Sequence, residues 1–175
     1  MNKKHPWKQA IITGLIVGIF AIGSFTLFDN LNKHFAWGIH SSTIRGLTGL
    51  LTLVILAIGI YTGMQSIKRT NGGKLTYVQA LLAGFVIALT TGIITALLGL
   101  IYSNCINPGY AAYMVSESTK EITSDGKSPA DVAAATPALA QQWSSGGQML
   151  QALIGQTVCG TLITLLMGLF LRTKK

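Results

Sequence analysis

The sequence predicts an all-α integral membrane protein, a bundle of four transmembrane helices with a long helical loop between the third and the fourth. Half of the 175 residues are hydrophobic and only 10% are charged, whereas about 25% of residues are charged in ordinary soluble domains. No charged residue occurs in four long segments, 9–28, 46–67, 78–102 and 149–171. We therefore expect a single domain over residues 1–175, with these segments as its spans and residues 103–148 as the long loop.

Each uncharged segment is long enough to cross a bilayer. The four segments have 20, 22, 25 and 23 residues, and about 20 residues of helix cross a hydrocarbon core of about 30 Å. They are apolar nearly all round, whereas a helix of a soluble core has a polar stripe. The first segment is longer than the apolar region of a signal peptide, which has about 7–15 residues. We expect it to be a retained helix.

The distribution of charge predicts the orientation. With four spans, the N-terminus, the 68–77 turn and the C-terminus lie on one side, which holds nine of the thirteen basic residues and none of the five acids. Basic residues close to span ends stay in the cytoplasm, so both termini are expected inside. The acids then lie outside, four of them in the long loop: Glu117, Glu121, Asp125 and Asp131. Because the basic residues form short clusters between apolar segments, the sequence argues against a nucleic-acid binder.

The long loop carries signals for helix starts. Asn107-Pro108 and Ser128-Pro129 each place a capping residue before a proline, and Asp131 stands at the third position after Ser128, close to a capping box. We expect two or three short amphipathic helices near the outer surface, with Pro137 starting another turn or kinking the second helix. The acids are expected to be solvated or near the positive ends of helix dipoles.

Small residues are expected to pack the spans against one another. In lipid, helices associate largely through close approach of their backbones, which small residues permit. The first two spans contain G-x-x-x-G pairs, and we expect these pairs to face each other, with Leu56 facing lipid. The alternative is an interface between two copies. The candidate packing residues are Gly14, Gly18, Gly59, Gly63, Gly84, Gly92, Gly155 and Gly160.

The chain contains a candidate internal repeat. Residues 7–14 read WKQAIITG and residues 77–84 read YVQALLAG, both aromatic-x-Gln-Ala-apolar-apolar-small-Gly. A duplicated helical hairpin explains this similarity. The alternative is that helix starts at the inner membrane interface resemble one another in general.

The sequence offers little for catalysis. No Asp, Glu, Lys, Arg or His lies within the four spans, although proton relays and ion pathways depend on such groups. Gln156 is expected to bond to threonines of the third span, and a role in binding a ligand is the less favoured alternative. The histidines show no metal-ligand spacing, and a cation site at Glu117 and Glu121, one helical turn apart, is the less favoured alternative to a solvated pair. We expect no enzyme activity, no catalytic residue, no metal and no cofactor.

Two motifs carry a resemblance to a known family. Lys68-Arg69 followed by GKLTYVQALLAG over residues 73–84 resembles its central motif, and INPGY over residues 106–110 resembles its second. The chain is similar, from about Trp7 to Leu171, to bacterial membrane proteins catalogued as domain of unknown function number four-one-nine-nine. The resemblance implies four helices and no assigned activity, so it implies no site residue.

These observations favour a small multi-pass protein of the bacterial inner membrane without catalytic machinery. Our first hypothesis is an accessory or assembly subunit, whose partners are the lipid bilayer and either another membrane protein or a second copy. The alternative is a carrier or flippase-like protein for a lipid-linked substrate such as a polyprenyl phosphate. In that case basic residues at the inner surface would contact the headgroup, namely Lys68, Arg69, Lys74 and Arg172.

Overall fold

The computed structural model describes residues 6–37 and 39–173, so Lys3, Lys4, His5, Lys174 and Lys175 lie outside the described part. Over the described residues the chain is all-helical, and a short π-helix, Tyr102–Ile106, continues α3. Four of the helices, α1, α2, α3 with the π-helix, and α6, are long and apolar enough to cross a membrane. This confirms an all-α fold with four candidate membrane spans. The helices are α1 Trp7–Phe35, α2 Ser41–Thr70, α3 Tyr77–Ile101, α4 Tyr110–Ser124, α5 Pro129–Trp143 and α6 Ser145–Leu171.

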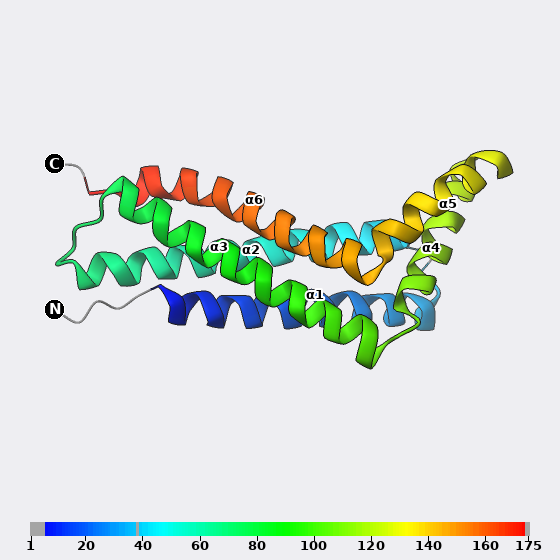
Figure 1. Ribbon diagram of the computed structural model, residues 1–175, viewed down its shortest axis with the longest axis horizontal. Coiled ribbons are helices and arrows are strands. Elements are labelled where there is room, and N and C mark those ends of the chain that lie inside the picture. The colour runs from blue at the N-terminus through cyan, green and yellow to red at the C-terminus, as the bar shows by residue number, and fades with distance from the viewer. Residues whose placement is uncertain (1–5, 38, 174–175) are drawn as a thin grey trace.

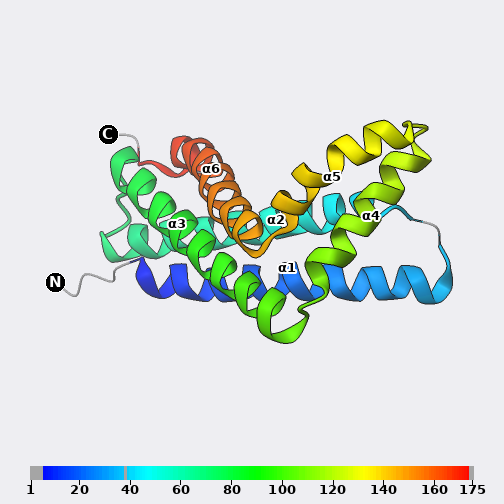
Figure 2. The ribbon, with the colours of Figure 1, turned by 45° about the vertical axis from the view of Figure 1, so that its right-hand side comes forward.

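The four long helices form an elongated bundle (Figure 1). One end, called here the basic end, holds the start of α1, the α2–α3 turn and the last turn of α6. At the other end α4 and α5 form a hairpin, and this is called the hairpin end (Figures 1 and 2). α3 packs along both α1 and α6, and α2 packs against α1, α3 and part of α6.

Two helices extend beyond their uncharged segments at the hairpin end. α1 continues through Asp29 and Lys33 to Phe35, and these two charges form an ion pair of 2.8 Å one helical turn apart. α2 begins at Ser41, five residues before the expected span, where a glutamate of α4 accepts a hydrogen bond from a backbone N–H of its first turn. A charged residue therefore ends the apolar segment here without ending the helix.

Small residues bring α3 and α6 close together. Gly84 faces the side chain of Thr164, and Gly92 faces the backbone of Leu153. A Cβ atom at Gly160 would lie 2.5 Å from the Cβ of Ala88. Because these positions carry no side chain, the two backbones approach more closely than larger residues would permit.

The glycines of α1 and α2 do not face one another, so the expected meeting of the two G-x-x-x-G pairs is wrong. Gly14 and Gly18 pack on α3, against Ile94 and Leu98. Gly59 faces Thr13 of α1, whereas Gly63 faces Ile87 of α3. α3 lies beside both α1 and α2, and it packs against some of the glycines of each helix.

Two other positions also differ from expectation. Leu56, expected to face lipid, is fully buried in the core and packs near Gly160 of α6. Gly155, expected to pack a helix, is exposed and has nothing within 4 Å of the place where a Cβ would lie. The spans are apolar on every side, so hydrophobicity alone does not show which side faces the core.

The two repeated segments occupy equivalent places. α1 and α3 are neighbours and both run from the basic end to the hairpin end (Figure 1). The buried positions of their first turns match at a separation of 70 residues: Ala10, Thr13, Gly14, Val17 and Gly18 in α1, and Ala80, Ala83, Gly84, Ile87 and Ala88 in α3. This matching burial supports the duplication, which stays a prediction.

The segment between α3 and α6 contains α4 and α5, joined by a turn with Gly126 at a φ of 80°. α5 starts with a capping box in which Ser128 and Asp131 bond each other's backbone N–H. Pro137 lies inside α5, which continues to Trp143, so the proline does not start another turn. The alternative of a kink at Pro137 stays a prediction. The Thr136 hydroxyl donates to the carbonyl oxygen of Val132 at 2.8 Å, an additional local hydrogen bond beside the proline.

Candidate functional site

Polar contacts fix the hairpin to the end of α1. The Asp29 carboxylate is buried, and the Tyr113 hydroxyl of α4 donates to its two oxygens at 2.8 and 2.9 Å. Lys33 donates to the same carboxylate at 2.8 Å and lies 3.9 Å from the centre of the Tyr113 ring. The buried charge is thus paired and hydrogen-bonded, as such charges need to be. Burial raises the pKa of Tyr113, so this phenol remains a donor at neutral pH.

Two glutamates of α4 hold the hairpin on the start of α2. Glu121 accepts from the Ser42 backbone N–H at 2.7 Å and pairs with Arg45 at 3.3 Å. Glu117 accepts from the Ser41 hydroxyl at 3.3 Å and pairs with Lys120 at 2.7 Å. A carboxylate at a helix N-terminus is stabilised by the free N–H groups and the helix dipole. These carboxylates therefore serve as contacts between α4 and α2.

Trp143, at the end of α5, is buried at the centre of this contact. Its indole N–H donates to the Ser118 hydroxyl at 3.2 Å, and the Arg45 guanidinium lies 5.2 Å from the centre of its ring. The ring belongs to an apolar cluster with Phe25 and Met114. One tryptophan thus joins α5 to α4, α2 and α1.

A groove opens between α2 and α6 below the hairpin. Its volume is about 420 Å³, and it receives residues from α1, α2, α3, α4 and α6. Arg45, Thr48 and Thr52 form much of the α2 wall, and Gln151 and Gln156 belong to the α6 wall. Tyr110 of α4 also lines the groove. Burial of the Tyr110 phenol, and to a smaller extent the nearby Tyr102, raises the pKa of Tyr110 to about 12. The groove is therefore lined by a cation, neutral polar groups and apolar surface.

Several buried polar atoms around the groove have no hydrogen-bond partner among the described residues. They include Nη1 of Arg45, Oε1 of Gln156 and Oγ1 of Thr95, and all three residues line the groove. The expected bond from Gln156 to threonines of the third span is thus not made by Oε1. Most buried polar groups in folded proteins are paired. Three of the seven unpaired buried side-chain atoms of the described residues belong to this groove, which, together with its cation, makes it a candidate binding site.

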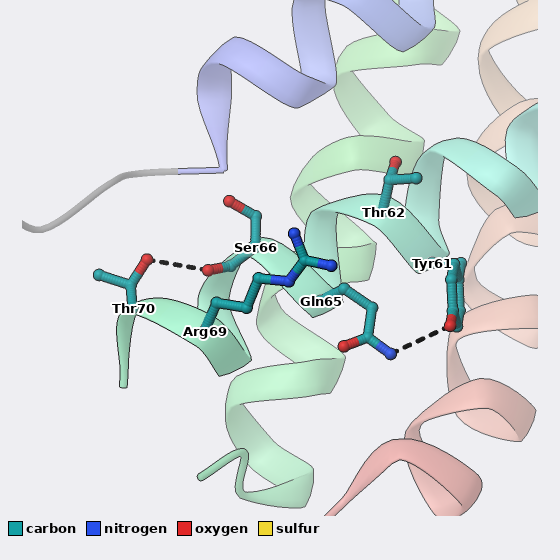
Figure 3. A pocket seen from close by; sticks show the side chains of 6 residues that line it. All are labelled: Tyr61, Thr62, Gln65, Ser66, Arg69 and Thr70. Atoms are coloured by element: carbon teal, nitrogen blue, oxygen red, sulfur yellow. Dashed lines mark hydrogen bonds between the residues drawn. The ribbon is translucent and has the colours of Figure 1, made fainter. Parts of the chain in front are cut away.

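The basic residues proposed for a headgroup lie at the basic end but do not share one pocket. Lys68 donates to the backbone carbonyl oxygen of Leu171 at 3.1 Å and so contacts the end of α6. Arg69 lines a hollow of about 390 Å³ with Tyr61 and Gln65, which are joined by a hydrogen bond (Figure 3). Lys74 and Arg172 are exposed. All residues of this hollow come from α2, so it is a feature of one helix surface.

The groove was not predicted from the sequence. Arg45 is one of the four basic residues that lie outside the expected inner side, and it precedes Thr48, Gly49 and Thr52 at helical spacing. That spacing places a cation and small polar residues on one face of α2, which is a detectable signal. The approach of Gln151 and Gln156 from α6 is a tertiary feature and has no local signal.

Replacing Tyr113 by phenylalanine should loosen the hairpin. The variant leaves the buried Asp29 carboxylate with Lys33 as its only described partner. Hydrogen bonds to charged groups contribute about 1.5–3 kcal/mol, and we expect a loss of that order in the stability of the hairpin contact. Hydrogen exchange of the α4 amides should become faster, whereas exchange in α3 should stay unchanged. The matched control is Tyr61→Phe, on an exposed surface of α2; equal effects would contradict the role of Asp29.

The chain matches one protein-family model, but it matches neither a curated protein nor a solved structure. The family model described as "Protein of unknown function (DUF4199)" matches residues 8–173, nearly the whole chain. The chain therefore belongs to the family of proteins of unknown function called DUF4199.

Proposed function

We propose that this protein is a non-enzymatic accessory or assembly subunit of the bacterial cytoplasmic membrane, and that its hairpin docks a partner membrane protein. One observation carries the proposal: the hairpin is fixed to the bundle by buried polar contacts, yet α5 presents an exposed face of small residues. Asp29 and Glu121 join α4 to the bundle, and the ring of Trp143 lies beside Arg45 of α2. A fixed surface of this kind is preorganised for binding, which lowers the entropic cost of association.

The exposed face of α5 suits close approach of another polypeptide. Its members recur at helical spacing and are Ala130, Ala133, Ala134, Pro137 and Ala138. Pro137 has no backbone N–H, so the carbonyl of Ala133 lacks the helical partner that it would otherwise have. Small side chains beside a free carbonyl oxygen provide both close contact and a hydrogen-bond acceptor.

Site-specific photo-crosslinking in cells tests the proposal. A photoreactive residue at Ala134 or Ala138 should give one discrete crosslinked protein, which should also co-purify in stoichiometric amount. Ser116, exposed on α4, is the control position and should give no such product. Crosslinks to lipid alone, or equal crosslinking from Ser116, would contradict docking through α5.

The orientation belongs to the same proposal, and we expect the basic end in the cytoplasm. Lys8, Lys68, Arg69, Lys74 and Arg172 lie there, and basic residues near spans stay inside. Single cysteines at Lys74 and Ser124, in a chain lacking Cys105 and Cys159, should react oppositely with an impermeant thiol reagent. Labelling from outside at position 74 would reverse the orientation.

A carrier for a lipid-linked substrate is the second candidate function. The observation that favours it is the groove between α2 and α6, which places Arg45 beside an otherwise largely apolar and small-residue lining. Purification from native membranes separates the two functions, because a stoichiometric protein favours the subunit and a retained lipid favours the carrier.

A further inference from the structure

We propose that the groove between α2 and α6 binds an anionic amphiphile from the bilayer, with its acidic headgroup on Arg45 and its alkyl chain along the groove. This inference does not depend on a partner protein at the hairpin. It is carried by the shape of the groove, by the position of its single cation and by the unpaired polar atoms around it.

The groove has the form of a slot that is closed at one end. Arg45 and Leu53 mark its length on α2, and Gln151 and Cys159 mark it on α6. Each pair spans eight residues of helix, which corresponds to about 12 Å. Toward the basic end the slot closes, because Gly160 of α6 packs tightly against its neighbours there. Midway along its length the slot is open beside Gly49 and Gly155, both exposed and without an atom within 4 Å of a Cβ position.

The cation at the hairpin end of the groove is only partly neutralised. Arg45 uses Nη2 for Glu121 at 3.3 Å, and its buried Nη1 has no partner among the described residues. Glu121 does not line the groove; it lines a separate hollow under the hairpin, which Arg45 also borders. The Arg45 guanidinium therefore lies between the groove and this hollow, and its carboxylate partner, Glu121, lines the hollow and not the groove. An anion in the groove would complete the hydrogen bonding of Arg45.

Two further unpaired side-chain atoms of the groove indicate which chemical groups the ligand carries. Oε1 of Gln156 is an acceptor without a donor, and the Oγ1 of Thr95, a residue 9% exposed, has no partner in the described chain. A buried acceptor is costly unless a donor reaches it. A ligand with a hydroxyl or amide group close to its headgroup would supply that donor.

The source of the anion is expected to be a lipid. Ala21, Phe25, Leu53 and Ala152 contribute apolar surface to the groove. A free phosphate would leave this surface uncovered, whereas an alkyl chain would bury it at about 25 cal/mol per Å². The two helices that form the slot are both candidate membrane spans, so a lipid would have direct access to it.

Binding of a defined probe tests the inference. The full-length protein in a nonionic detergent is titrated with hexadecyl phosphate, and bound ligand is counted by native mass spectrometry. We expect saturable binding of one molecule and a rise in melting temperature with concentration. Hexadecyl phosphocholine, which has no net charge, should bind at least about tenfold more weakly, since charge-assisted hydrogen bonds to Arg45 are diminished. Inorganic phosphate alone should give no stabilisation at the same concentrations.

Variants connect the binding to the groove. Arg45→Gln should weaken binding at least about tenfold. Arg45 also contacts the hairpin, so Glu121→Gln serves as its control: it breaks the same ion pair but leaves the cation free, and it should bind the probe as tightly as the unaltered chain or more tightly. Gly49→Leu and Gly155→Leu should abolish binding by filling open space in the groove. Gly46→Leu is the matched control, also in open space on α2 but outside the groove.

Each contrary result overturns the inference in a different way. Unchanged binding in both filling variants would exclude the groove, and equal binding of the phosphocholine would exclude an anionic headgroup. Stabilisation by inorganic phosphate to the same degree would exclude a lipid source. A photoreactive residue in place of Leu53, a large side chain that already lines the groove, that crosslinks to a protein helix and never to lipid would exclude an amphiphile, while leaving docking at α5 unaffected.

Discussion

Truncating Trp143 to alanine should destabilise the hairpin by about 3–5 kcal/mol, the usual cost of removing a large aromatic side chain from a core. Trp143 is 9% exposed and packs with Phe25, Ile44 and Met114. The variant also leaves the Ser118 hydroxyl without its indole donor. Far-ultraviolet circular dichroism during heating, together with hydrogen exchange of α4 and α5, measures the loss.

Trp37 provides the matched control for that measurement. It lies near the same end of the bundle but is 53% exposed, so Trp37→Ala should change stability little. Equal losses in the two variants would mean that Trp143 does not anchor α5. Loss of the α3 and α6 signals together with the hairpin signals would mean that the hairpin and the bundle unfold as one unit.

Replacing Gly92 by leucine should separate α3 from α6 and lower the free energy of unfolding by about 1–3 kcal/mol, as other overpacked sites do. A Cβ at this position would lie 3.0 Å from the carbonyl oxygen of Leu153 and 3.3 Å from its Cα. Backbone atoms cannot rotate away as the end of a side chain can, so the whole helix has to move. Chemical denaturation in mixed micelles measures the loss.

Gly99→Leu is the control in the same helix. Gly99 has nothing within 4 Å of a Cβ position, so leucine there should be tolerated. A large loss at Gly99, or none at Gly92, would contradict the α3–α6 contact. The comparison also separates packing from helix propensity, because both variants gain the same propensity from losing a glycine.

The spans were predictable from sequence because apolar length is a local property. Val78–Tyr102, for example, differs from α3 by only one residue at each end. The mutual arrangement was not predictable, because the spans are apolar on every side and the small residues do not show which neighbour they meet. Gly14 and Gly63 both lie against α3, and Leu56 faces the core, although nothing local distinguishes Leu56 from a lipid-facing leucine.

The hairpin contacts and the groove were missed for a related reason. Glu121 bonds the first turn of α2 through Ser42, which lies 79 residues earlier in the chain, and such a contact has no trace in the spacing of nearby residues. The groove exists because α6 packs tightly at Gly160, against Ala88 and Leu56, whereas no atom lies within 4 Å of a Cβ position at Gly155. Both glycines belong to one span and look alike in the sequence, yet one is buried and the other is open.

The pairing of α3 with α6 has a consequence for the order of assembly. α3 forms its most extensive contact with α6, a helix that follows only after the entire hairpin. During synthesis α3 therefore enters the membrane with Gly84 and Gly92 uncovered. Contacts between distant segments form late, and exposed surface before that stage favours misassembly. A chain stopped before residue 145 would retain this uncovered face, which makes such a fragment a natural substrate for membrane quality control.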